Sequence, residues 1–160
     1  IFTKVLKGHI AVANTNLKKD YNGKKIDIRA RKFLKKSNLD YAHGTGHGVG
    51  FFLNVHEGPQ SISKINKIKI REGMILSNEP GYYLKNKFGI RIENLVYVKK
   101  TKKNIFFENL TMAPIEKDLT NFKILTSSEK NYLFKYHLNV YSKISKFLNN
   151  NERRWLAGLI

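Results

Sequence analysis

The sequence predicts an α+β fold, in which a mostly antiparallel sheet is preceded and followed by helices. Three observations predict it. Apolar residues recur at helical spacing near the N-terminus, this period disappears between Tyr41 and about Ile115, and it returns after Thr126. In the middle stretch, short apolar or alternating runs are separated by glycines, prolines and polar residues, as in sheets. Helices and strands do not alternate regularly along the chain.

Two amphipathic helices are expected first. Residues 16–25, between them, are rich in Lys, Asn and Asp and predict a surface connection. Asp27 stands near the start of the second helix. The apolar face of the first helix comprises Phe2, Val5, Leu6, His9 and Ile10, and that of the second comprises Ile26, Ala30, Phe33 and Leu34.

Five segments are expected to form the strands. In one of them Ile90 and Ile92 would face one side, and Arg91 and Glu93 the other. The alternation alone therefore leaves the burial of Glu93 open, since an outward-facing surface carboxylate would give the same pattern. The expected strand segments are residues 50–55, 62–70, 74–77, 89–98 and 104–114.

A long amphipathic helix is expected near the C-terminus. Thr126 and Glu129 have the spacing of a capping box, which marks its start. Residues 149–151, three asparagines, are expected to end it, and residues 152–159, with Trp155, to add one more turn. Core packing is the simpler interpretation of its apolar face, and a dimer interface is the alternative. That face comprises Leu133, Tyr136, His137, Val140, Tyr141, Ile144, Phe147 and Leu148.

The composition limits what the chain can be. Its 160 residues, 41% of them hydrophobic, are enough for one packed domain. It has no cysteine, so disulfides and thiolate zinc sites are excluded, and any metal must be bound by nitrogen and oxygen. No apolar run approaches the length of about 20 residues that a membrane span needs. The first residues, IFTKVLKGHI, lack an initiator methionine and the layout of a signal peptide, so we expect a piece of a longer protein.

The net charge of +18 raises the question of nucleic-acid binding. The lysines are spread through the chain, and no known nucleic-acid motif gathers them onto one face. We therefore predict a solvated basic surface and no specific nucleic-acid partner, although polyanions should bind at low salt. The paired lysines are Lys18-Lys19, Lys24-Lys25, Lys35-Lys36, Lys99-Lys100 and Lys102-Lys103.

Three histidines and two carboxylates predict a metal site. His43, His47 and His56 fall within fourteen residues of a glycine-rich stretch, and Glu79 and Glu93 follow in or directly after apolar strands. His47 lies between two glycines, which let the backbone approach closely and leave the imidazole facing open space. A lone histidine is more often a core or surface group than a ligand, but this clustering favours function. Buried carboxylates need a partner or a metal.

Three blocks in this order resemble aminopeptidase P of the cytosolic type, in the methionine aminopeptidase and prolidase superfamily. They are HGTGHGVG with NVHEGP, then EGMILSNEPGYY, then FGIRIENLVYV, and similarity continues through VLKGHIAVA, LTMAPIEKDL and YHLNVY. The resemblance implies the C-terminal half of a pita-bread catalytic domain over residues 1–149, with its C-terminal helix. Residues 150–160 would be a short extension.

The resemblance also implies a role for each site residue. His47 and Glu79 would bind one metal ion, and Glu93 would bridge two. His43 and His56 would be catalytic residues that contact the substrate. Arg91 would steady Glu93, and Tyr83 would lie near the substrate cleft.

The implied reaction uses two divalent ions, most simply Mn²⁺, with Zn²⁺ and Co²⁺ as alternatives. They would activate a hydroxide that hydrolyses the bond between an N-terminal residue and a following proline. Peptides with proline at the second position would be the substrates of a cytoplasmic, metal-dependent aminopeptidase that forms a homodimer, without a membrane anchor.

One departure from the family pattern matters. Two aspartate ligands of the family come from an upstream DGTTDVTR-like block that is not in this chain, and Asp20, Asp27 and Asp40 do not have that context. We therefore expect this chain alone to bind metal weakly and to be inactive without the upstream half. The alternatives are a prolidase or methionine aminopeptidase-like enzyme, and an inactive pita-bread binding module.

Overall fold

The computed structural model describes residues 1–18, 21–52 and 54–160. These form two compact units, one comprising Ile1 and residues 3–111, and the other Phe2 and residues 112–160. Three residues named or included in the predictions above lie outside the described residues. They are Lys19 of a lysine pair, Asp20 of the surface connection and Leu53 of a predicted strand. The first unit has the mixture of helices and antiparallel strands that the sequence predicts.

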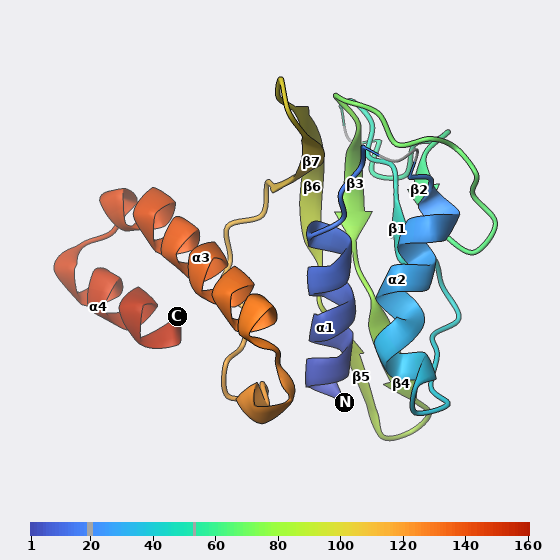
Figure 1. Cartoon of the computed structure of the whole chain (residues 1–160). Coiled ribbons are helices and arrows are strands. Elements are labelled where there is room, and N and C mark those ends of the chain that lie inside the picture. The colour runs from blue at the N-terminus through green and yellow to red at the C-terminus, as the bar shows by residue number, and fades with distance from the viewer. Residues whose placement is uncertain (19–20, 53) are drawn as a thin grey trace. The chain divides into compact units, whose positions relative to one another are not determined.

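Both N-terminal helices are confirmed, as α1 (Phe2–Ala13) and α2 (Gly23–Lys35). The side chain of Asn22 accepts a hydrogen bond from the Lys25 amide at 3.0 Å and so caps α2. Figure 1 shows the two helices side by side. They approach so closely that a Cβ atom on Gly8 would lie 2.6 Å from the Ala30 carbonyl oxygen.

The described residues then form seven strands, and every pairing between them is antiparallel. β1 pairs with β2, β4 pairs with β5, and a three-stranded sheet has the order β3-β6-β7. The core of the unit lies between this sheet and the two helices, with Leu76, Val96 and Ile26 fully buried. The strands are β1 (Gly46–His47), β2 (Ser61–Ile62), β3 (Ile75–Asn78), β4 (Gly81–Leu84), β5 (Phe88–Arg91), β6 (Asn94–Lys100) and β7 (Ile105–Asn109).

Three of the predicted strand segments are wrong in extent. The described part of residues 50–55 has no strand, because Phe52 has a positive φ of 46°, which an extended strand cannot hold. In residues 62–70 only the start is a strand, since the Asn66 side chain accepts from the Ile68 amide at 2.8 Å and turns the chain. Residues 89–98 divide into β5 and β6, which lie in different sheets. β3 and β7 confirm the other two segments, with β7 shorter than predicted.

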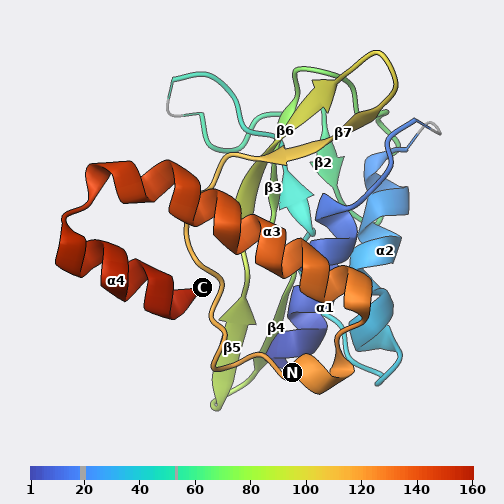
Figure 2. The ribbon, with the colours of Figure 1, turned by 60° about the vertical axis from the view of Figure 1, so that its left-hand side comes forward.

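The second unit is helical, with a 3-10 turn η1 (Phe122–Ile124), α3 (Ser127–Ile144), a second turn η2 (Ser145–Phe147) and α4 (Asn150–Leu159). Figure 2 shows α3 and α4 as an antiparallel pair. The capping box is confirmed: Glu129 accepts from the Thr126 amide at 2.7 Å, and Thr126 Oγ1 accepts from the Glu129 amide at 3.3 Å.

The predicted C-terminal end of α3 is wrong. Asn149 accepts from the amides of Asn151 and Glu152, and Glu152 accepts from the Asn149 amide, so the asparagines begin α4. The last segment is thus a full helix, on which Trp155 is exposed. The predicted boundary between residues 1–149 and 150–160 stays a prediction. Among the described residues, no helix is long and apolar enough to cross a membrane.

Glycine at position 46 is required by the approach of β1 to β3. A Cβ atom there would lie 2.0 Å from the Ser77 carbonyl oxygen, which belongs to the backbone and cannot move aside. We expect Gly46→Ala to lower the free energy of unfolding by about 1–3 kcal/mol or more, the cost typical of an added side chain in a tightly packed site. Gly158→Ala is the control, because a Cβ there meets open space. Equal stability of the two variants in urea denaturation would contradict the packing.

His9 should make the fold sensitive to acid. Its ring is fully buried in α1, and among the described residues neither ring nitrogen has a hydrogen-bond partner. Burial lowers the pKa of His9 to about 4. The unfolded chain therefore binds the proton more tightly, and stability falls as the pH drops from about 6.5 to 4, by up to about 1.4 kcal/mol per pH unit.

The measurement is the free energy of unfolding against pH for the wild type and His9→Leu. The difference between the two proteins should grow in favour of the variant over this pH range. A constant difference would show that His9 does not carry the acid sensitivity.

Candidate metal centre

The two glutamates are brought together by strand register. β3 pairs with β6 so that Asn78 faces Asn94, and β4 pairs with β5 so that Gly81 faces Arg91. The same antiparallel register continues across the break between the two sheets, which sets Glu79 opposite Glu93. The Ile92 amide donates to the Pro80 carbonyl oxygen at 3.3 Å within this break. The interruption that divides residues 89–98 into two strands therefore lies at the carboxylates.

His47 comes to the same place because residues 45–49 run beside β3. The Glu79 amide donates to the Thr45 carbonyl oxygen at 2.8 Å, and the Val49 amide donates to the Ile75 carbonyl oxygen at 3.0 Å. Gly48 forms a bridge with Leu76 between these contacts. The histidine lies at the centre of this short pairing, next to the end of β3.

His47, Glu79 and Glu93 form one cluster. One ligand atom from each can be chosen so that all three lie within 4.8 Å of one another. His47 Nε2 is 3.3 Å from Glu79 Oε1. One imidazole and two carboxylates are a nitrogen and oxygen donor set that suits divalent ions such as Mn²⁺. The chemistry and spacing of these groups therefore fit the metal that the sequence implies.

The orientation of the His47 ring suits a ligand. Its Nδ1 lies 3.0 Å from the Gly48 carbonyl oxygen, which can only accept, so Nδ1 carries the proton. Nε2, the other ring nitrogen, faces the Glu79 carboxylate, where a metal ion would be bound. Metal-binding histidines commonly have this arrangement, because the hydrogen bond fixes both the tautomer and the ring.

Glu79 is almost fully buried, and two neighbours offset the cost of burying its charge. Ser77 Oγ donates to Oε1 at 2.9 Å, and Arg91 Nη1 lies 3.0 Å from Oε2. Ser77 Oγ also accepts from the His47 amide at 2.9 Å, so one hydroxyl connects two members of the cluster. The ion pair of Arg91 is thus with Glu79, whereas the sequence predicts that it steadies the exposed Glu93.

His43 lies at the end of a directional hydrogen-bond chain. Arg91 Nε donates to the Tyr83 hydroxyl at 2.7 Å, and that hydroxyl is 3.0 Å from His43 Nε2. His43 Nδ1 is 2.6 Å from the Gly44 carbonyl oxygen and therefore carries the ring proton. Nε2 accepts from Tyr83 in this neutral form. The structure brings the predicted residues Arg91, Tyr83 and His43 together beside the cluster, since Arg91 also contacts Glu79.

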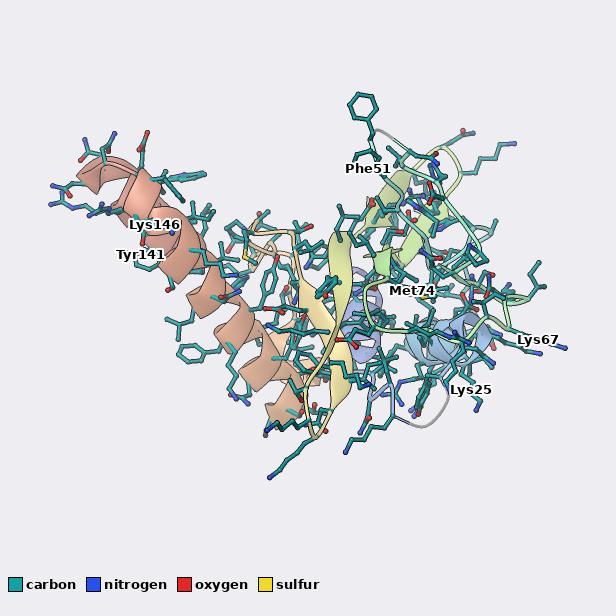
Figure 3. All side chains as sticks on the ribbon, turned by 90° about the horizontal axis from the view of Figure 1, so that it is seen from above. Lys25, Phe51, Lys67, Met74, Tyr141 and Lys146 are labelled. Carbon is teal, nitrogen blue, oxygen red and sulfur yellow. The ribbon has the colours of Figure 1, made fainter. Side chains whose placement is uncertain are left out.

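His56 is exposed, and its ring centroid is 4.0 Å from that of His47. It lies in the connection between β1 and β2, where Phe51 and Phe52 are also exposed, at 88% and 82%. Figure 3 shows Phe51 projecting away from the ribbon. Phe51, Phe52 and Val55, in the segment predicted to be a strand, therefore do not contribute to the hydrophobic core. The same connection brings His56 next to His47.

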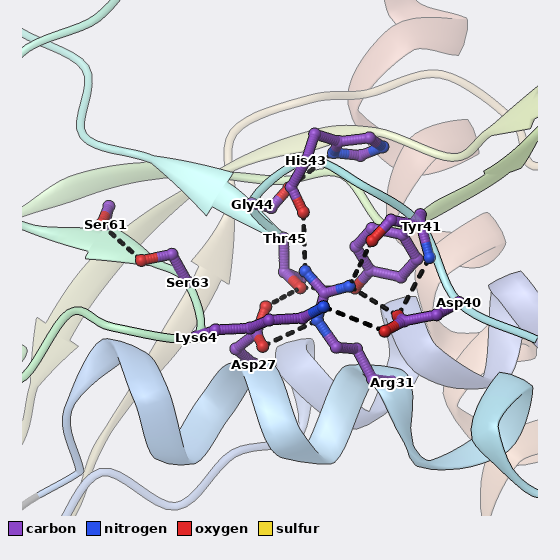
Figure 4. A network of polar contacts seen from close by, with 10 residues as sticks. All are labelled: Asp27, Arg31, Asp40, Tyr41, His43, Gly44, Thr45, Ser61, Ser63 and Lys64. Carbon is purple, nitrogen blue, oxygen red and sulfur yellow. Dashed lines mark hydrogen bonds and ion pairs between the residues drawn. The ribbon is translucent and has the colours of Figure 1, made fainter.

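Four residues near the cluster were not assigned a site role from the sequence. Ser77 connects His47 to Glu79, and Asp27, Arg31 and Thr45 form a buried polar network under the histidine segment (Figure 4). Asp27 and Arg31 are one helical turn apart on α2. The sequence signal for this network is a pair of opposite charges one helical turn apart, on the same face of α2 as the apolar Leu34.

Asp27 and Asp40 do not replace the two aspartate ligands that the resemblance places upstream. Asp27 and Asp40 both accept from Arg31, at 2.7 and 2.6 Å. Burial would raise the pKa of Asp40, but hydrogen bonds from Arg31 and Lys64 lower it to about 2. These carboxylates are thus already paired within the described residues.

Several lysines line a hollow elsewhere in this unit, a cavity of about 600 Å³. They come from three separate segments of the chain, so the structure gathers part of the charge that the sequence spreads out. This hollow is compatible with the polyanion binding expected at low salt. Its basic residues are Lys18, Lys69, Arg71, Lys100, Lys102 and Lys103.

Comparison with known families gives two matches along the chain. A model described as metallopeptidase family M24 matches residues 1–100, and one described as the C-terminal region of peptidase M24 matches residues 103–158. A probable Xaa-Pro aminopeptidase P of Laccaria bicolor is 46% identical over 97% of this chain. Xaa-Pro aminopeptidase 1 of Dictyostelium discoideum is 43% identical over 99% of it.

The chain is also similar to solved structures of peptidases that are named for their action at proline. An X-prolyl aminopeptidase from Caenorhabditis elegans, described as a cytosolic enzyme with a di-nuclear active site, matches 99% of this chain with a TM-score of 0.89 and 36% identity. A prolidase from Pyrococcus furiosus matches 69% of the chain with a TM-score of 0.61 and 31% identity. The chain covers 27% and 31% of those two proteins, respectively.

The chain spans about a quarter of the length of the curated relatives that it matches, 26% for the Laccaria protein and 27% for the Dictyostelium protein. Within that span, the likeness in sequence and structure confirms the predicted pita-bread fold. With the family models matching nearly all of its residues, the chain belongs to metallopeptidase family M24.

Proposed function

We propose that the protein containing this chain is a metal-dependent Xaa-Pro aminopeptidase, which hydrolyses the bond between an N-terminal residue and a following proline. The observation that carries the proposal is the cluster of His47, Glu79 and Glu93, with ligand atoms within 4.8 Å of one another. It lies in a chain whose relatives are named Xaa-Pro aminopeptidases. This chain contributes three ligands, and an upstream half contributes the two aspartates.

Each residue has a distinct role in the proposed site. His47 and Glu79 would hold one of two divalent ions, and Glu93 would be a ligand of both. When bound, such ions lower the pKa of water and polarise a substrate carbonyl. Ser77 and Arg91 orient the buried Glu79 carboxylate through their contacts at 2.9 and 3.0 Å.

The substrate is held by His43, His56 and Tyr83. In the present geometry Tyr83 donates to His43 Nε2, so Nε2 accepts there and offers no proton to a substrate carbonyl. Protonation of Nε2 makes His43 a donor to the carbonyl oxygen, which favours the developing negative charge. The exposed His56, beside His47, is the second donor.

Manganese is the metal we propose, because an oxygen-rich site with one imidazole suits it better than a site of structural zinc. We also propose that the whole protein is a cytoplasmic homodimer that acts on peptides with proline in second place. The chain alone should bind metal weakly, since Glu93 would lack its aspartate partners as a bridge.

Two other functions are less well supported. A prolidase would use the same ligands, but the relatives from Laccaria bicolor and Dictyostelium discoideum, at 46% and 43% identity, are named Xaa-Pro aminopeptidases, whereas the prolidase of Pyrococcus furiosus is 31% identical. A binding module without catalysis would have no chemical need for three metal ligands together with both accessory histidines. The basic hollow favours binding of anions in general, at a place that shares no residue with the metal cluster.

The test is release of the N-terminal residue from an Xaa-Pro peptide by the complete protein with added Mn²⁺. Glu93→Gln keeps the size of the side chain but removes the bridging charge, and His47→Ala removes a ligand. We expect each to lower kcat/KM by at least about 100-fold, because the loss of a residue that only supports a metal ligand already costs up to about 100-fold.

Glu108→Gln is the matched control, because Glu108 is a half-buried carboxylate on β7 that pairs with Lys99 away from the cluster. It should retain the wild-type rate. A rate unchanged by Glu93→Gln and His47→Ala would overturn the site assignment. Cleavage of Xaa-Pro dipeptides with no action on longer peptides would instead support the prolidase alternative.

A further inference from the structure

The segment that carries the histidines is fixed by a side chain rather than by pairing with a strand. Among the described residues, no backbone-to-backbone hydrogen bond is formed by residues 40–44, although regular pairing resumes at Thr45. Buried backbone carbonyl groups need donors from elsewhere. The carbonyl oxygens of Tyr41 and His43 find them in Arg31, at 2.7 and 2.6 Å.

Four of the five N–H groups of Arg31 have an acceptor. Its Nε donates to Asp27 Oδ2 at 2.7 Å, and its Nη1 donates to Asp40 Oδ1 at 2.6 Å as well as to Tyr41. The guanidinium carbon also lies 3.8 Å from the centroid of the Tyr41 ring. Arg31 is only 2% exposed, so these contacts are made away from water. Figure 4 shows the guanidinium surrounded by its acceptors.

Asp27 extends the network to the metal ligands. Its Oδ2 holds Arg31, and its Oδ1 accepts from Thr45 Oγ1 at 2.7 Å. The Tyr41 hydroxyl contacts the same Thr45 oxygen. Since the Thr45 hydroxyl donates to Asp27, it accepts from Tyr41. The Thr45 carbonyl oxygen in turn accepts from the amide of Glu79, and His47 follows Thr45 by two residues.

We propose that Arg31, held in place by Asp27, is a positioning residue for the metal centre. It fixes the backbone at Tyr41 and His43, and through Asp27 and Thr45 it sets where His43 and His47 stand relative to Glu79. This inference rests on the proposed function, since it concerns the same metal site. Arg31 touches neither the cluster nor Tyr83, so it acts only through the segment that it holds.

The chemistry requires arginine. A lysine at this position keeps the charge but offers a single ammonium group, which cannot reach two carboxylates and two carbonyl oxygens arranged around a planar fork. Arg31→Lys therefore leaves carbonyl groups of the histidine segment unsatisfied. Lost positioning of this kind typically weakens metal binding or activity by about 10-fold to 100-fold.

The experiment uses the complete protein and two readouts, Mn²⁺ affinity by titration calorimetry and kcat/KM on an Xaa-Pro peptide. Arg31→Lys should weaken both by about tenfold or more. Arg154→Lys, a change at an exposed arginine on α4, is the matched control and should leave both within about twofold of wild type. Both variants are measured at a temperature where circular dichroism shows them folded.

A second pair of variants tests the connection through Thr45. Thr45→Ser keeps the hydroxyl that donates to Asp27, whereas Thr45→Val has nearly the same shape without it. Thr45→Ser should retain the Mn²⁺ affinity and Thr45→Val should lose about tenfold. This comparison also decides the matter if Arg31→Lys does not fold.

A merely structural role has a different signature. Arg31→Lys and Thr45→Val would then melt at lower temperature but, while folded, bind Mn²⁺ as tightly as wild type, and this result would overturn the inference. Failure of the proposed function is seen in the wild type itself, which would neither bind Mn²⁺ nor cleave the peptide, and the inference would fall with it.

Discussion

The close approach of residues 45–49 to β3 is the constraint on which the site depends. Gly46 leaves no space for a side chain against the Ser77 carbonyl, and hydrogen bonds on both sides of it tie the segment to the strand. His47 is thereby held beside the end of β3, where Glu79 leaves the sheet. The register of the neighbouring strands adds Glu93 from the opposite side. The three candidate ligands, far apart in sequence, are thus brought together by backbone geometry.

Polar groups below this crossing keep it in place. Ser77 connects the His47 amide to Glu79, Arg91 neutralises Glu79, and Arg31 satisfies the carbonyl groups of the segment before His47. Ser77, Glu79 and Arg31 are buried, Arg91 reaches Glu79 from the exposed side, and each has a partner, which is the condition under which buried charge is tolerated. Metal sites need such support, because ligands that move by about an ångström bind weakly. The residues that provide this support, Asp27, Arg31, Ser77 and Arg91, all belong to this chain.

Sequence reasoning could predict the site better than the network beneath it. His47, Glu79 and Glu93 are residue types with metal chemistry, and their motifs are specific. The role of Arg31 could not be predicted in the same way, because two of its acceptors are backbone carbonyl groups, which every sequence has. Similar limits explain the errors in the fold. The apolar run at residues 50–55 has the composition of a strand, but its phenylalanines are exposed. Asn149 is equally compatible with ending one helix and with beginning another, and only its hydrogen bonds to Asn151 and Glu152 decide.

The central claim is that His47, Glu79 and Glu93 bind a divalent ion, and locating that ion tests it most directly. Crystals of the complete protein would be soaked in Mn²⁺, and diffraction data would be collected at the manganese absorption edge. The account predicts an anomalous peak within coordination distance of His47 Nε2 and of both carboxylates, and its loss in crystals of Glu93→Gln. Manganese bound elsewhere, with no peak at these three side chains in saturating Mn²⁺, would contradict it.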